Sequence, residues 1–214
     1  SPDGAPLCES VQPLDSMSAF VLTCFDSPGS AVIEKTISLT IDSPALWWPN
    51  NLGRQPLYRL SVSFRAREDD GSGCVTIAAR DSWTGRVGLR TLAVDQKKDE
   101  WGSSFALTVN GVCFFAMGAD YVPEDSILSR VTREKTERLI RSAAQANHNC
   151  IRVWGGANYP EDWFYDLCDE YGLVIWHDHM MACGVYELDD AFRDNIVHEV
   201  IDNVRRVRHH ASLG

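Results

Sequence analysis

Three polar segments in the second half of the chain contain the side chains that are suited to catalysis or ligand binding. They run from Gly118 to Pro123, from Trp154 to Tyr159 and from Trp176 to Cys183, and each follows a short apolar run. In parallel α/β units the functional groups gather where strands end and loops begin. We therefore expect these three segments to line one candidate site.

A cation stands in the middle of the second apolar run. Side chains alternate along a strand, so Arg152 shares a side with Trp154, while Ile151 and Val153 face the other way. A guanidinium inside a barrel must meet an anion, and both a structural ion pair and a catalytic supporting role stay open for Arg152. Trp154 offers a flat apolar face with an N–H donor, which suits stacking on a sugar ring as well as an ordinary core position.

The third segment has the residue types of a metal site without its geometry. His177 and His179 lie on one side of an extended chain, Asp178 lies on the other, and Cys183 follows nearby. Metal ligands must converge, and no second pair at a recognisable spacing completes a set. We expect no metal and no cofactor here, and we favour hydrogen bonding to a polyhydroxylated ligand.

The elements that must position these segments alternate between strand and helix after about residue 110. Nearly unbroken apolar runs predict strands at 114–118, 150–154 and 173–176. A helical stripe covers 132–146, and a second helix begins with Pro160 at its first position and ends at Gly172. Asp189 or Asp190 can cap a third helix that ends near His209 and His210, a pair expected to be solvated. Its predicted buried face consists of Phe192, Ile196, Val197, Val200, Val204 and Val207.

The order βαβαβα permits an open doubly wound sheet or the first part of an eight-stranded barrel. No GxGxxG motif follows the first strand, and the pair Gly155-Gly156 lacks the third glycine of a dinucleotide loop. The barrel is therefore favoured, and a nucleotide-binding open sheet lacks its phosphate loop.

The first half of the chain has a period near two. Runs rich in Val, Ile, Thr, Phe and Leu predict strands at 18–25, 31–41, 57–67, 74–79 and 104–109, separated by turn signals. Short antiparallel strands at this spacing are typical of an immunoglobulin-like β-sandwich. We predict two domains, a sandwich over residues 1–105 and the start of a TIM barrel over residues 106–214.

Composition narrows the class of protein. Lys+Arg 20 against Asp+Glu 30 gives a formal net charge of −10, which provides no positive surface for nucleic acid or anionic lipid. Seven cysteines without a CxxC pair make a disulfide framework improbable. No targeting segment and no membrane-spanning run is visible, so we expect a cytoplasmic piece of a longer polypeptide.

Four stretches resemble one enzyme family. LWWPNNLGRQPLY at 46–58, VNGVCFFAMGADYVPEDS at 109–126, the stretch from IRVWGG to ELDDAF at 151–192 and the following HHASLG are similar to glycoside hydrolase family two, in its β-mannosidase branch. The resemblance implies a retaining, exo-acting β-mannosidase that removes terminal β-D-mannose, built from an immunoglobulin-like sandwich and a TIM barrel. It also implies that Arg152 supports catalysis and that Trp154, Asp178 and Asp120 bind substrate.

The resemblance places both catalytic carboxylates elsewhere. In the proteins that this chain resembles, a fourth strand follows at once and ends in an Asn-Glu pair whose Glu is the acid/base, and the nucleophilic Glu comes later. Retaining glycosidases need both. We therefore expect this chain alone to be inactive, and we regard Glu124, Glu161 and Glu187 as loop or helix-cap carboxylates. An incomplete barrel also predicts self-association through its exposed half.

Two departures from the family pattern touch the expected sugar pocket. The family usually has Asn and Trp where this chain has Asp120 and Tyr121, and it has Gln and Phe where this chain has His177 and His179. Two alternatives therefore stay open: another family-two glycosidase (β-galactosidase, β-glucuronidase or glucosaminidase), or a noncatalytic carbohydrate-binding protein.

Overall fold

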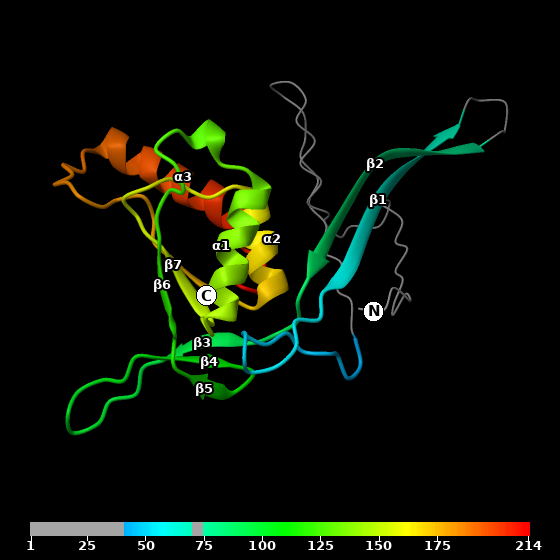
Figure 1. The fold of residues 1–214 in the computed structure, drawn as a ribbon. Helices are drawn as coiled ribbons and strands as arrows, with labels where there is room; N and C mark the ends of the chain where they lie inside the picture. Colours follow the sequence, from blue (N-terminus) through cyan, green and yellow to red (C-terminus); the bar gives the residue numbers. More distant parts are fainter. Residues whose placement is uncertain (1–40, 70–74) are drawn as a thin grey trace. The chain divides into compact units, whose positions relative to one another are not determined.

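The computed structural model describes residues 41–69 and 75–214 (Figure 1). Residues 45–214 form one compact unit, and every contact reported below lies within it. The strands expected at 18–25 and 31–41 lie outside the described residues, apart from Ile41.

A long antiparallel hairpin confirms two of the expected strands. β1 (Tyr58–Asp69) pairs with β2 (Val75–Val87), and the register shifts between Phe64 and Arg65. β2 runs eight residues beyond the predicted end at 79, through a stretch that mixes Trp83 with polar residues and Gly85.

A second antiparallel sheet corrects one prediction. It consists of β3 (Leu92–Asp95), β4 (Ala106–Val109) and β5 (Val112–Phe114), in that order. Asn110 and Gly111 join β4 to β5 with φ angles of 49° and 81°. Two consecutive positive φ values are the signature of a type I′ hairpin turn, for which Asn-Gly is the preferred pair. The predicted parallel strand at 114–118 is therefore wrong, because its apolar run is divided between the end of β5 and the link to the next strand.

The third sheet is parallel, and its strands follow one another in chain order. It consists of β6 (Gly118–Tyr121), β7 (Cys150–Val153) and β8 (Val174–His177). A short 3₁₀ helix (Leu128–Arg130) and α1 (Arg133–Gln145) connect β6 to β7, α2 (Asp162–Tyr171) connects β7 to β8, and α3 (Asp190–Val207) follows β8. The predicted βαβαβα order is confirmed, and Figure 1 shows α1 and α2 side by side along this sheet.

The helix ends follow local sequence signals in most cases. The Thr132 side chain accepts a hydrogen bond from the Lys135 N–H at the start of α1, and Asp189 accepts one from Phe192 N–H at 2.8 Å at the start of α3. Gly172 ends α2 in the left-handed conformation, with φ of 74°. Pro160 was expected at the first position of α2, but the helix begins at Asp162 after the N-cap Glu161.

The core has two layers, one on each side of the parallel sheet. On the helix side, Ile151, Val153 and Ile175 pack against Ile140 of α1 and against Phe164 and Leu167 of α2. On the other side, Cys150 and Val174 pack with Trp47, Val109 and Phe114, so that the second sheet covers the amino-terminal ends of β7 and β8. The carboxyl ends of the parallel strands remain open to the loops.

The apolar face of α3 is less covered than the sequence predicts. Of its six expected buried residues, only Val207 is buried, while 47% of Val197 and 42% of Val204 remain exposed. In the described part of the chain only the last turn of α3 reaches the core, so the prediction of a fully buried face is wrong here.

Two further observations concern domain limits and membranes. The predicted boundary between residues 105 and 106 falls between β3 and β4, which pair with each other, and the two-domain division stays a prediction. Among the described residues, no helix has the length and apolar character that crossing a bilayer requires.

Candidate functional site

An ion-paired cluster lies at the carboxyl ends of the three parallel strands. Asp120, Arg152 and Trp176 are register partners across β6, β7 and β8, so they share the face turned away from the helices. Arg152 Nη2 and Nε donate to the two carboxylate oxygens of Asp178 at 2.6 Å and 3.2 Å. Arg152 Nη1 lies 3.5 Å from Asp120 Oδ1. The sequence predicted an anionic partner for Arg152, and that partner is Asp178. Asp120 makes a second, longer contact.

The cluster is accessible rather than buried. The exposed fraction is 42% for the Arg152 side chain, 55% for Asp120 and 22% for Asp178. The hydrogen bonds that Arg152 donates to Asp178 raise the pKa of Arg152, so the guanidinium keeps its charge. An accessible cation fixed between two carboxylates can present oxygen acceptors and N–H donors to a polar ligand.

Two glycines shape the wall beside the cluster. The Gly155 N–H donates to Asp178 Oδ2 at 3.2 Å, and a Cβ at Gly155 would lie 2.4 Å from the carbonyl oxygen of His179. A Cβ at Gly156 would lie 2.2 Å from the indole ring of Trp154, so Trp154 lies directly against this glycine. Trp154 is half-buried and directly follows β7, so it lies near this site in the chain. Among the described residues it makes no hydrogen bond to Arg152.

The two histidines beside Asp178 differ from the sequence expectation. His177 faces the helix side, where Nε2 lies 2.8 Å from Tyr165 Oη and Nδ1 lies 2.7 Å from the carbonyl oxygen of Asp178. Both ring nitrogens of His177 therefore have partners within the chain, so the ligand hydrogen bonding predicted for this segment falls to its other polar side chains. His179 is exposed and lies 3.4 Å from the hydroxyl of Tyr159.

Glu124 makes hydrogen bonds that connect two parts of the fold. Its Oε1 accepts hydrogen bonds from the hydroxyls of Tyr121 and Thr136, both at 2.7 Å, and so connects the loop after β6 to α1. Burial is the first cause that raises the pKa of Tyr121, and the Glu124 hydrogen bond adds to it, so the hydroxyl remains a donor. Among the residues that the structure describes, no group of three or more His, Cys, Asp or Glu side chains could hold a metal ion.

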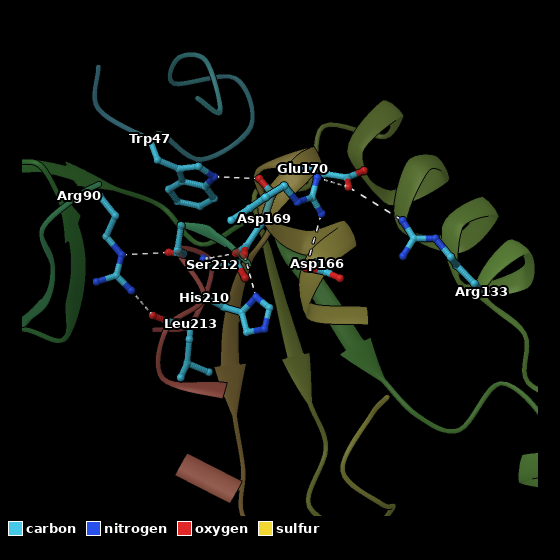
Figure 2. Close-up of polar contacts among 11 residues, drawn as sticks. Trp47, Arg90, Arg133, Asp166, Asp169, Glu170, His210, Ser212 and Leu213 are labelled. Atoms are coloured by element: carbon cyan, nitrogen blue, oxygen red, sulfur yellow. Dashed lines mark hydrogen bonds and ion pairs between the residues drawn. The ribbon is translucent and has the colours of Figure 1, made fainter. Parts of the chain in front are cut away.

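A buried network that the sequence analysis missed holds the parallel sheet in place (Figure 2). Asp169 of α2 is 2% exposed, and its carboxylate accepts from His210 Nδ1 and from the Ser212 backbone N–H, both at 2.7 Å. The Trp47 indole N–H donates to the carbonyl oxygen of Asp169 at 2.8 Å. His210 is 6% exposed, so the expectation of a solvated helix end is wrong for His210, while His209 is exposed.

The residue types in this network resemble a catalytic triad, but the geometry does not. Ser212 is fully buried and joins Asp169 through its backbone N–H, while its hydroxyl has no partner among the described residues. A nucleophilic serine needs a hydroxyl that contacts its base and substrate. Asp169, His210 and Ser212 therefore form a structural clip.

The motif at 46–58 adds hydrogen bonds to the ends of α1 and α2, next to this clip. The Asn50 side chain donates to the carbonyl oxygens of Ala144 at 2.8 Å and His148 at 2.9 Å, which satisfies acceptors at the end of α1. The Asn50 N–H donates to the carbonyl oxygen of Gly172, just past α2, at 2.7 Å. Arg90 donates to the carbonyl oxygens of Ala211 and Leu213, as Figure 2 shows.

Comparisons with known proteins agree with the sequence resemblance. The model of the family "Glycosyl hydrolases family 2" matches residues 21–90. Beta-mannosidase B of Thermothelomyces thermophilus is 38% identical over 182 residues, which are 84% of this chain and 20% of that protein. Beta-mannosidase A of Aspergillus niger is 35% identical over 218 residues, covering 95% of this chain and 22% of that protein.

A solved structure extends the similarity to the fold. The crystal structure of beta-D-mannosidase from Dictyoglomus thermophilum matches with a TM-score of 0.72 and 32% identity over 85% of this chain and 22% of that chain. Sequence and fold together relate the chain to the glycoside hydrolases of family two. The two curated relatives and the solved structure named here are β-mannosidases, so the recognition made from the sequence is confirmed. The chain spans about a fifth of the length of the curated relatives that it matches.

Proposed function

We propose that this chain is the part of a retaining, exo-acting β-mannosidase that contains the end of an immunoglobulin-like sandwich and the first three βα units of a TIM barrel. The observation that carries the proposal is the cluster of Asp120, Arg152 and Asp178 at the carboxyl ends of three adjacent parallel strands. Barrel enzymes place their active sites at this end. The β-mannosidase relatives supply the substrate class, a terminal β-D-mannoside.

The outer edge of β8 supports the assignment to a barrel. The Ile175 N–H donates to the carbonyl oxygen of Ser212 at 2.7 Å, and the Gly214 N–H donates to the carbonyl oxygen of Ile175 at 2.9 Å. Leu213 and Ile175 therefore form a parallel bridge beside β8. A fourth parallel strand in consecutive order is what a barrel requires at this position.

In this proposal each candidate residue has a defined role. Arg152 lies beside the nucleophilic carboxylate of the whole enzyme and keeps it ionised through a charge-assisted hydrogen bond. Asp178 and Asp120 bind sugar hydroxyls, and Trp154 stacks on the sugar ring. For the whole enzyme we also propose a cytoplasmic location.

The test compares two polypeptides, the 214-residue chain and the product of the whole reading frame that encodes it. The longer product should hydrolyse p-nitrophenyl β-D-mannoside faster than the corresponding β-galactoside, β-glucuronide or β-glucosaminide. The 214-residue chain should stay at the buffer rate, because orientation cannot replace an absent nucleophile and acid.

Two results would overturn the proposal. Hydrolysis by the 214-residue chain that disappears in Glu124→Gln would place a catalytic carboxylate in this segment. A preference of the longer product for another glycoside would select a different family-two specificity, and sugar binding without hydrolysis by that product would select a noncatalytic carbohydrate-binding protein.

A further inference from the structure

His177 and Asp178 lie next to each other in the chain but on opposite sides of the sheet. His177 is the register partner of Val153, whose side chain belongs to the core between the sheet and the helices. Asp178 directs its carboxylate to Arg152, which lies on the face turned away from those helices. His177 therefore cannot reach the candidate pocket, yet it is bonded to the residue that does.

The hydrogen bonds of His177 define its tautomer. The carbonyl oxygen of Asp178 can only accept, so His177 Nδ1 carries the hydrogen of the 2.7 Å contact. His177 Nε2 is then free to accept from the Tyr165 hydroxyl at 2.8 Å. Burial is the main cause that raises the pKa of Tyr165, which keeps the hydroxyl protonated, and burial likewise lowers the pKa of His177, which keeps the imidazole neutral.

Ring packing restrains the same imidazole. The Tyr165 ring is parallel to it within 4° at a centroid distance of 5.9 Å, and the Tyr159 ring stacks at 5.6 Å. Tyr165 is fully buried in α2 and lies against Phe164 and His210. The orientation of His177 is thus set by a helix residue that is itself fixed in the core.

Asp178 is held through its main chain and its side chain. Its N–H donates to the carbonyl oxygen of Val153 at 3.1 Å, and its own carbonyl oxygen accepts from His177. Its carboxylate accepts from Arg152 and from the Gly155 N–H. Without the His177 bond, the peptide that follows Asp178 would lose the contact that fixes its orientation after β8 ends.

We propose that Tyr165 and His177 are positioning residues that fix the main chain of Asp178 and thereby direct its carboxylate into the sugar pocket. The inference rests on the proposed function in so far as Asp178 binds the substrate. Because the contact acts on a binding residue, its loss should raise KM more than it lowers kcat.

The kinetic test uses the product of the whole reading frame and p-nitrophenyl β-D-mannoside. Tyr165→Phe removes the donor to His177 while keeping the ring, and we expect KM to rise about fivefold with a smaller change in kcat. His177→Ala should raise KM further, and His177→Gln, which restores an N–H donor, should recover part of the loss. Tyr171→Phe is the matched control, because Tyr171 also lies in α2 and its hydroxyl bonds Glu137 at 3.4 Å instead.

A crystal structure of each variant separates this inference from the proposed function. If the wild-type product does not act on mannosides, the proposed function fails, whereas the position of Asp178 still decides the present inference. We expect the Asp178 carboxylate to leave Gly155 N and to lose one Arg152 contact in Tyr165→Phe and in His177→Ala. An unchanged Asp178 in Tyr165→Phe, or an active enzyme in which that variant leaves KM unchanged, would overturn it even if His177→Ala does not fold.

Discussion

Arg152 shows how one guanidinium organises three strand ends. Its planar fork bonds both oxygens of Asp178 and still directs a third nitrogen to Asp120. Because 42% of the Arg152 side chain remains exposed to solvent, these ion pairs add little to the free energy of unfolding. Their effect is orientation, since a bidentate pair fixes direction as well as distance.

Replacing this fork by a single ammonium group should cost activity and spare the fold. In the product of the whole reading frame, Arg152→Lys should lower kcat by at least about tenfold, because Lys lacks the fixed fork of donors that holds the nucleophilic carboxylate ionised. Steady-state kinetics and a melting curve measure the two effects separately. Near wild-type turnover in a folded variant would contradict the assignment of Arg152 to the active site.

The protonation of His177 predicts a pH effect on stability. Burial lowers the pKa of His177 below the ordinary value of 6.5, so the folded state favours the neutral imidazole. A depressed pKa gives a contribution that is complete above the unfolded-state pKa and is lost as the pH falls through the folded-state pKa. The melting temperature should therefore decrease from pH 7.5 to pH 5.

The control for this effect replaces a different histidine by glutamine, a residue that does not titrate. The decrease should be smaller in His177→Gln, while His198→Gln, which changes an exposed histidine of α3, should keep the wild-type slope. Equal slopes in all three proteins would assign the pH dependence to other groups, among them His209, whose pKa burial also lowers.

At the residue scale the sequence could predict some residues of the candidate site, but not the contacts that hold them in position. Arg152 was visible because it interrupts an apolar strand, and strand alternation placed it on the face opposite Ile151 and Val153. Asp178 was visible as a carboxylate at a strand end. The bond from Tyr165 to His177 was not, because it depends on how α2 lies against β8 and on two ring orientations that spacing alone does not define.

At the scale of elements, the buried carboxylate of Asp169 joins α2 to the segment after α3. Figure 2 shows His210 and Ser212 on one side of Asp169 and the Trp47 indole on the other. A buried carboxylate is tolerated only when its oxygens are bonded, and here both of them are. The clip therefore fixes the chain beside β8 at the place where a fourth strand would begin.

Removing this carboxylate should destabilise the unit far more than removing its exposed neighbour. Asp169→Ala leaves the His210 and Ser212 donors unpaired, at about 1–3 kcal/mol for each buried group. Asp166→Ala, also in α2, removes only an exposed pair with Arg86 at 3.5 Å and should change the free energy of unfolding by less than about 1 kcal/mol. Urea unfolding of both variants measures the difference, and equal losses would contradict the role of the clip.

The sequence predicted which elements form better than it predicted where they are joined. The parallel order, the cap at Asp189 and the end of α2 at Gly172 follow local signals that tertiary packing did not override. The strand at 114–118 was wrong because the Asn110-Gly111 turn divides an apolar run between two sheets. The position of Asp169 in α2, next to Cys168 and four residues after Tyr165, was an available sign that it lies on the buried face.

At the scale of the whole described unit, apolar side chains remain uncovered on the face that holds Arg152. Trp176 is 44% exposed, Phe105 is 56% exposed and Phe115 is 82% exposed. The rings of Phe105 and Trp176 lie 5.4 Å apart and line a hollow of about 330 Å³ together with Leu107, Cys113, Phe114 and Phe115. An apolar surface of this kind tends to become covered by another surface.

The isolated 214-residue chain should therefore self-associate through this face. Size-exclusion chromatography with light scattering should give a mass above 23.9 kDa that falls on dilution. Phe115→Ser should weaken the association, because it removes the most exposed of the three aromatic rings without disturbing a buried contact. Val185→Ser is the matched control, since Val185 is fully exposed in the loop before α3 and its change should leave the mass as it is. A 23.9 kDa monomer with one sharp, cooperative melting transition would show that this part of a barrel is self-sufficient and that its open face needs no partner.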